Sequence, residues 1–278
     1  MADYRTDPDL EFLQTLKSEE LNDLVYCLTH DKDGALRYTE SLTNNPKYKK
    51  YYPDHHQYWQ DIAGELQTFG GNTIVNLFRR HGVLYREILW DVCGKLKVEI
   101  NYERPKYERL NIGDSLRLNI GDSLEFLTQK IPTQFIEQRL LEKILQEALK
   151  NMSYEEIKAL VTELGIENTD SLTAQGAAAA FIAIYRAGGF KSYQITVIIV
   201  NAIWKFIFGR GLTIGGNVIL TKTISILIGP IGMAITALWT VLDIAGPAYR
   251  VTIPATIQVA YLRSLSENRE QIESHSST

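Results

Sequence analysis

The chain has 278 residues, of which 45% are hydrophobic and 22% are charged, and this excludes collagen-like, low-complexity and wholly disordered proteins. The two cysteines, Cys27 and Cys93, exclude a disulfide scaffold and a four-cysteine zinc site and indicate a reducing compartment. A net charge of −4 is not a nucleic-acid-binding signature, and the first residues lack the apolar stretch of a signal peptide. We therefore expect a cytoplasmic protein without nucleic-acid partners.

Residues 1–48 are predicted to form a short helical segment. Ser18 is expected to cap a helix that has two glutamates in its first turn and apolar residues at helical spacing. The following run, Asn44–Asp54, is rich in lysine and tyrosine and contains two prolines, so it predicts a loop.

Residues 49–170 are predicted to form a body of amphipathic helices. Ser153 and Glu156 have the spacing of a capping box, which marks the start of a helix. The sequence RLNIGDSL occurs at Arg109–Leu116 and again, unchanged, at Arg117–Leu124. Because this copy is too short to be a solenoid repeat, we interpret it as a duplication within a loop or hairpin insertion near residues 100–130.

Residues 171–265 are predicted to form an apolar, basic, glycine-rich bundle of helices or hairpins, followed by a disordered polar tail at 266–278. Ser171–Leu262 holds only seven of the chain's 29 basic and 33 acidic residues, which gives it a charge of +5 against −9 elsewhere. These seven are Arg186, Lys191, Lys205, Arg210, Lys222, Asp243 and Arg250. An acidic helical body joined to a basic apolar region is therefore expected.

The apolar region contains three runs without a charge: Ser192–Trp204, Gly211–Thr221 and Thr223–Leu242. A helix needs about 20 apolar residues to cross the roughly 30 Å hydrocarbon core of a bilayer. Only Thr223–Leu242 is long enough, and Gly229-Pro230 near its middle would kink or break the helix. We therefore predict short apolar helices that form either a buried core or a membrane-inserting unit.

No motif in the chain predicts catalysis, a cofactor or a metal site. Thr29–Glu40 resembles a calcium-binding EF-hand loop, but Thr29 stands where the first aspartate ligand belongs, so a helix–turn–helix with Gly34 as the helix cap is favoured. Gly209–Ile214 lacks the third glycine of a dinucleotide-binding loop. An enzyme is therefore the least favoured class, and Arg79–His81 and Glu65 are the residues to inspect for one, together with Asp243 and Arg250.

Basic residues that bracket apolar runs are typical of side chains that reach toward anionic lipid headgroups. Lys205, Arg210 and Lys222 are placed in this way. The residues that we expect to contact a membrane are Trp204, Lys205, Phe206, Phe208, Arg210, Lys222, Leu227, Ile228 and Trp239.

The end of the apolar region carries two further predictions. Arg250 lies among apolar residues and needs a partner, and Asp243, seven residues earlier, is expected to form a buried ion pair with it. Tyr249–Ile253 has β-branched residues at alternating positions, which predicts a short extended piece before a final helix over Ala255–Leu265.

Several blocks of sequence together resemble a known family. These are Thr6–Gln14, Ile62–Ile74, Arg79–Lys97 and Gly246–Arg263. The chain resembles the bacterial YaaW-like (UPF0174) family, whose N-terminus is of the DUF3944 type, over nearly its whole length. Residues 62–97 are also similar, more weakly, to the ubiquinol–cytochrome c chaperone family. Neither resemblance supplies catalytic residues.

Two hypotheses follow. The first is a non-enzymatic membrane-interacting protein in which the acidic body regulates or displays the apolar region, with a pore-forming or membrane-perturbing effector as its more specific form. Its partner would be anionic lipid, and it would lie peripherally at the inner membrane or insert there conditionally. The second is a helical interaction or assembly protein, chaperone-like, in which the apolar region is the buried core. A protein partner or self-association would then be expected.

Overall fold

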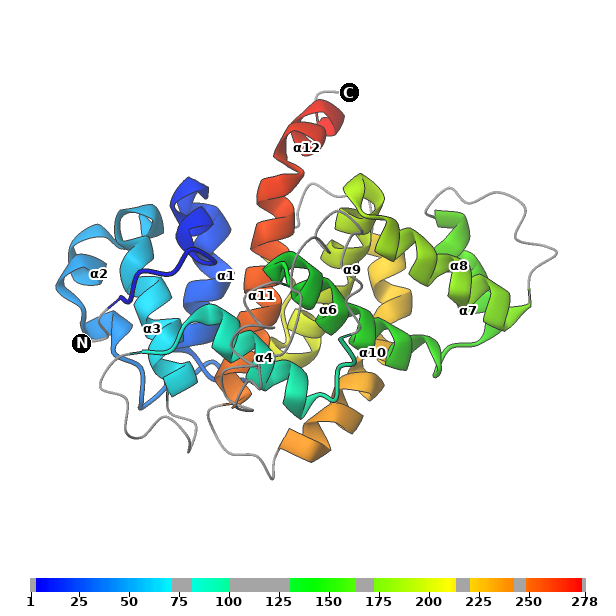
Figure 1. The fold of residues 1–278 in the computed structure, drawn as a ribbon, viewed down its shortest axis with the longest axis horizontal. Helices are drawn as coiled ribbons and strands as arrows, with labels where there is room; N and C mark the ends of the chain where they lie inside the picture. Colours follow the sequence, from blue (N-terminus) through cyan, green and yellow to red (C-terminus); the bar gives the residue numbers. More distant parts are fainter. Residues whose placement is uncertain are drawn as a thin grey trace, which may run out of the picture.

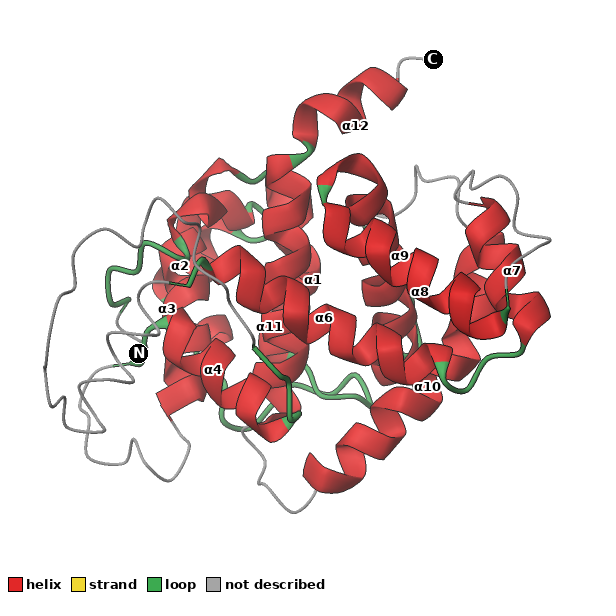
Figure 2. Ribbon diagram, turned by 45° about the vertical axis from the view of Figure 1, so that its right-hand side comes forward, coloured by secondary structure: helices red, strands yellow, loops and turns green. Residues whose placement is uncertain are grey.

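The computed structural model describes residues 4–71, 82–100, 131–163, 173–213, 221–242 and 249–276, without the side chains of 71, 163, 221–225, 237–242 and 274–276. Over these ranges the regular structure is helical, apart from one isolated β-bridge between His30 and Leu36 (Figure 2). The all-α fold predicted from the sequence is confirmed. The duplicated RLNIGDSL segments lie outside the described residues.

The N-terminal part contains short helices packed around α1. Its helices are η1 (Glu11–Thr15), α1 (Ser18–Thr29), η2 (Leu42–Asn44), α2 (Pro46–Tyr51), η3 (His55–Tyr58), α3 (Trp59–Gly71) and α4 (Tyr85–Lys95). These helices surround a common core, in which leucines such as Leu13, Leu24 and Leu66 are fully buried. Helix α1 starts where the sequence predicts, but Ser18 is its first residue and Lys17 is the N-cap, whose backbone N–H donates to Glu20 Oε2 at 2.7 Å.

The middle and C-terminal parts contain longer helices. They are α6 (Thr133–Leu149), α7 (Tyr154–Glu163), α8 (Ala174–Ala187), α9 (Gly189–Phe208), α10 (Thr221–Leu242), α11 (Tyr249–Glu267) and α12 (Arg269–Ser276). The predicted capping box at the start of α7 is confirmed, because the backbone N–H of Ser153 donates to Glu156 Oε2 at 2.7 Å and the backbone N–H of Glu156 donates to Ser153 Oγ at 3.3 Å.

Helix α11 is the centre of the molecule. It contacts η1, α1, α3 and α4 as well as α6 and α9, and it runs through the middle of the ribbon in Figure 1. Every side chain from Val251 to Arg263 is buried, so this helix is enclosed on all sides. A helix with that environment belongs to an interior rather than a surface. The acidic and apolar parts of the sequence therefore share one core.

A buried polar group lies beside α11. Arg263 Nε donates to Glu137 Oε2 of α6 at 2.8 Å, and the hydroxyl of Tyr85 in α4 donates to Glu137 Oε1 at the same distance. A second Arg263 nitrogen donates to the carbonyl of Asp9 at 2.6 Å. Because a buried charge without partners is very costly, these bonds fix the positions of α4, α6 and α11 relative to one another.

The extended piece predicted over Tyr249–Ile253 is wrong, because α11 already begins at Tyr249. Pro254 lies inside this helix and cannot donate the hydrogen bond that the carbonyl of Arg250 would normally accept. The side chains of residues 251–253 are all buried in the core. Burial of these apolar groups outweighs the local preference of β-branched residues for extended backbone.

Two predictions in the N-terminal part are also corrected. Asn44–Asp54 is not a loop throughout, because α2 begins at Pro46 and Asn45 caps it by accepting a hydrogen bond from the backbone of Lys47 at 2.8 Å. Proline at the first helical position loses no hydrogen bond, since that N–H has no partner within a helix. Gly34 is not a helix cap: α1 ends at Thr29, and Gly34, with φ of 81°, belongs to the turn between His30 and Leu36.

Candidate functional site

Helices α9 and α10 form the packed pair that carries the candidate site. Two glycines with positive φ, Gly188 and Gly189, precede and begin α9, and Gly209, in the left-handed conformation with φ of 69°, ends it. Glycine adopts this backbone without the steric cost that a Cβ would bring, so these residues set the length of α9. Most of α9 is buried, but Lys205 and Phe206 near its end are exposed.

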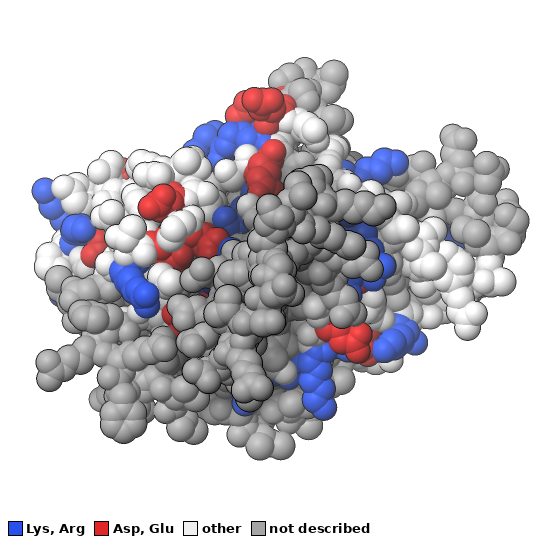
Figure 3. Space-filling view, in the orientation of Figure 1, with Lys and Arg blue, Asp and Glu red and all other residues white. Residues whose placement is uncertain are grey.

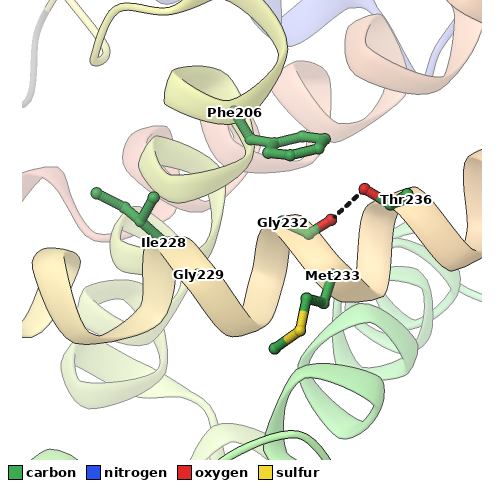
Figure 4. A pocket seen from close by; sticks show the side chains of 6 residues that line it. All are labelled: Phe206, Ile228, Gly229, Gly232, Met233 and Thr236. Atoms are coloured by element: carbon green, nitrogen blue, oxygen red, sulfur yellow. Dashed lines mark hydrogen bonds between the residues drawn. The ribbon is translucent and has the colours of Figure 1, made fainter.

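An apolar groove of about 520 Å³ lies between the two helices. It is lined by Phe206 of α9 and by Ile228, Gly229, Gly232, Met233 and Thr236 of α10, as Figure 4 shows.

The side chains at the mouth of this groove are large and apolar. Phe206 is 45% exposed and Met233 is 51% exposed. The hydroxyl of Thr236 donates to the carbonyl of Gly232 at 2.8 Å, so its hydrogen bond is satisfied within α10 (Figure 4). The groove therefore offers a ligand apolar contact rather than titratable groups or nucleophiles.

Gly232 allows the ring of Phe206 to rest directly on α10. A Cβ added at this position would come within 2.8 Å of Phe206 Cδ2, which is closer than real Cβ contacts. At Gly229 an added Cβ would meet no atom within 4 Å, so the groove is open there. The two glycines thus have different roles: Gly232 lets the Phe206 ring pack against α10, and Gly229 leaves open space in the groove.

A buried carboxylate connects the end of α9 to α1. Asp23 is 1% exposed and accepts hydrogen bonds from the backbone N–H of Thr213 at 2.7 Å and from its hydroxyl at 2.6 Å. Arg210 donates to Asp23 at 3.3 Å, and its guanidinium lies over the ring of Tyr26. Burial raises the pKa of Asp23 above its ordinary value, and the donors from Thr213 and Arg210 oppose that rise. We name this group the Asp23 cluster.

The nine residues predicted to contact a membrane have different environments. Trp204 and Leu227 are fully buried and Phe208 is 8% exposed, so in this structure they belong to the core. Lys205 and Phe206 are exposed, Ile228 is partly exposed in the groove, and Arg210 joins the Asp23 cluster. The side chains of Lys222 and Trp239 are not described. Asp243 lies outside the described residues, so the Asp243–Arg250 pair stays a prediction; Arg250 itself is exposed.

Two basic residues of the apolar region find acidic partners in distant parts of the chain. Arg186 pairs with Glu142 of α6, and Arg210 pairs with Asp23 of α1. Sequence proximity alone does not reveal these pairs. Gly229, Gly232 and Met233 were also not predicted as site residues, and the only sequence signal for them is their helical spacing beside Pro230.

Within the described part of the chain, no group of histidine, cysteine or acidic residues is placed to hold a metal ion. Arg79–His81 lies outside the described residues, and Glu65 is buried and accepts hydrogen bonds from the backbone N–H and the hydroxyl of Ser41. Among the helices described, none is both long enough and apolar enough to cross a membrane.

These features define an all-α protein whose candidate site is an apolar surface groove between two helices. Residues 4–38 match the family model described as a domain of unknown function, DUF3944, and residues 54–257 match the model described as Ubiquinol-cytochrome C chaperone. The chain belongs to the UPF0174 family and, through the second model, to the Ubiquinol-cytochrome C chaperone family.

Relatives in two bacteria cover most of the chain. A UPF0174 protein of Helicobacter pylori strain J99 is 46% identical over 94% of this chain and 92% of its own length. The UPF0174 protein YaaW of Escherichia coli K12 is 33% identical over 95% of this chain and 97% of its own length. No solved structure matches the chain.

Proposed function

We propose that this protein is a non-enzymatic, chaperone-like interaction protein that holds a partner protein during folding or assembly. The observation that carries the proposal is the match of residues 54–257 to the Ubiquinol-cytochrome C chaperone family model. That range includes α9, α10 and the groove between them. An open apolar surface is the feature that non-native or unassembled proteins require of a chaperone, because the hydrophobic effect drives their association.

Binding of an unfolded protein tests this function. The full-length protein is expected to bind reduced, carboxymethylated lactalbumin, which is permanently unfolded, and to leave native calcium-bound lactalbumin unbound. Isothermal titration calorimetry measures both interactions, and a negative heat-capacity change is expected because apolar surface is buried. Equal heats for the two forms, or no binding of either, would contradict a chaperone-like function.

A second candidate function is association with anionic lipid at the inner membrane. The observation that favours it is the absence of any acidic residue in the sequence from 171 to 242, together with the exposure of Lys205 beside Phe206. Insertion as a pore has no support in the described helices. Partition into anionic vesicles is the measurement that separates a lipid partner from a protein partner.

A further inference from the structure

The groove between α9 and α10 has dimensions that suit a helix. Its lining residues on α10 extend from Ile228 to Thr236, about 12 Å of helix axis at 1.5 Å per residue. The open space at Gly229 lets a partner side chain approach the backbone of α10 closely. Met233 is flexible and polarisable, so it adapts to different apolar side chains. Apolar residues spaced three and four apart on an amphipathic helix fill such grooves.

The charges next to the groove are basic. Lys205 adjoins Phe206 on α9, is exposed, and takes part in no ion pair among the described residues. Helical position 222 lies two turns before 229 on the same face of α10, and the sequence places a lysine there. Neither α9 nor α10 contains an acidic residue.

The acidic side chains of α6, which like α7 packs on α10, are already neutralised. Glu137 pairs with Arg263, Glu142 with Arg139 and Arg186, and Glu147 with Lys143 and Lys150. They therefore do not cancel the positive charge beside the groove. Charge complementarity favours an occupant that carries carboxylates next to its apolar face.

We propose that this groove binds the apolar face of an amphipathic helical segment of a partner protein whose flanking residues are acidic. The inference rests on the proposed chaperone-like function and names the chemistry of the segment that is held. The apolar contacts with Phe206 and Met233 supply most of the affinity, and Lys205 selects for acidic flanks.

Peptide binding to the full-length protein tests this assignment. The probe is an 18-residue fluorescein-labelled helix with leucines spaced three and four apart and glutamates at the flanking positions; the comparison peptide has lysine at each glutamate position. Fluorescence anisotropy is expected to show binding of the acidic peptide at least about tenfold tighter than the lysine peptide. Raising the ionic strength to 1 M is expected to reduce this preference, because salt screens exposed charges.

Two substitutions probe the groove, each with a matched control elsewhere. Met233→Glu is expected to weaken binding of the acidic peptide about tenfold or more, whereas Leu36→Glu, at a similarly exposed apolar side chain outside the groove, changes it less than about twofold. Lys205→Glu is expected to weaken it about fivefold, whereas Lys191→Glu, at the other end of α9, is expected to leave it unchanged. Circular dichroism checks that each variant is folded.

Three outcomes would overturn the groove assignment. If wild-type protein does not bind the acidic peptide, the groove does not bind such a helix. If it binds both peptides equally, it has no preference for acidic flanks. If Met233→Glu protein binds the acidic peptide as tightly as wild type does, the peptide-binding site lies elsewhere on the protein. Flotation with phosphatidylglycerol vesicles but not phosphatidylcholine vesicles, combined with no peptide binding, assigns the surface to lipid. If Met233→Glu protein still binds unfolded lactalbumin as wild type does, the chaperone-like function stands and only the groove assignment fails.

Discussion

His55 is a buried histidine whose protonation makes the stability of the folded protein depend on pH. It is 3% exposed, and its Nδ1 forms a hydrogen bond with the hydroxyl of Tyr58. Burial lowers the pKa of His55 to about 4, because the charged ring loses its contact with water, and Asp54 opposes this effect only in part. An ordinary histidine has a pKa of about 6.5. The unfolded chain therefore takes up a proton at a pH where the folded chain does not.

This difference predicts a specific loss of stability in acid. The contribution of neutral His55 is fully present above pH 6.5 and is lost as the pH falls toward 4, since protons then favour the unfolded chain. Between pH 7 and pH 4.5, the free energy of unfolding of wild-type protein is expected to fall by about 2 kcal/mol more than that of His55→Gln protein. Urea denaturation measures both. His56→Gln, at the exposed neighbouring histidine, is the control. If the free energy of unfolding of His55→Gln protein falls with pH as steeply as that of wild type, His55 is not responsible for the loss of stability.

At the scale of elements, the Asp23 cluster attaches the residues just after α9 to α1, in addition to the packing of α9 on α11 and of α10 on α6. The carboxylate of Asp23 accepts both donors of Thr213, and the backbone N–H of Leu212 is bound by Asn201 Oδ1 at 2.7 Å. The residues just after α9 are therefore hydrogen-bonded to α1 on one side and to α9 itself on the other.

Removing Asp23 tests the strength of that attachment. Asp23→Ala is expected to lower the free energy of unfolding by about 2–3 kcal/mol, because two donors of Thr213 and the partly exposed Arg210 lose their acceptor. Thr213→Val, which keeps the backbone donor, is expected to lower it by about 1 kcal/mol. Urea denaturation compares them with Asp33→Ala, an exposed carboxylate whose loss is expected to matter by less than about 0.5 kcal/mol. Equal stability of Asp23→Ala and Asp33→Ala proteins would contradict this role.

The sequence predicts elements well where the signal is local. The capping box at Ser153 and the acidic first turn after Ser18 both mark the starts of observed helices, because the groups that satisfy the first N–H donors are adjacent in sequence. Tyr249–Ile253 was predicted wrongly because its helix is imposed by packing against distant helices, which no local pattern reports.

The groove could not be predicted for a related reason. Most residues of α9 and α10 are apolar, and the few polar ones do not mark an exposed face clearly against a buried one. Phe206 is exposed and Ile228 is partly exposed, whereas Trp204 and Leu227, which are equally apolar, are buried, so membrane contact by these residues stays a prediction. Which of these side chains reaches solvent depends on how the two helices pack.

At the scale of the whole molecule, the uneven charge of the sequence is redistributed by folding. Ion pairs between distant parts of the sequence, such as Arg186–Glu142 and Arg210–Asp23, bring bases of the apolar region to acids of the body, and on the face in Figure 3 basic and acidic side chains are interspersed. Helix α11 joins the acidic and apolar parts in one core, so the apolar region is largely an interior. Among the described residues of this region the groove is an apolar surface that stays open, and this supports the proposed partner-binding function.

Hydrogen–deuterium exchange of the full-length protein, with and without saturating unfolded lactalbumin, tests this account most directly. Helical amides exchange through local opening, and a bound partner slows that opening where it contacts the protein. The account predicts slower exchange in the last turns of α9 and over residues 226–236 of α10, with α2 and α3 unchanged. Unchanged exchange throughout the chain, or protection confined to helices away from the groove, would contradict it.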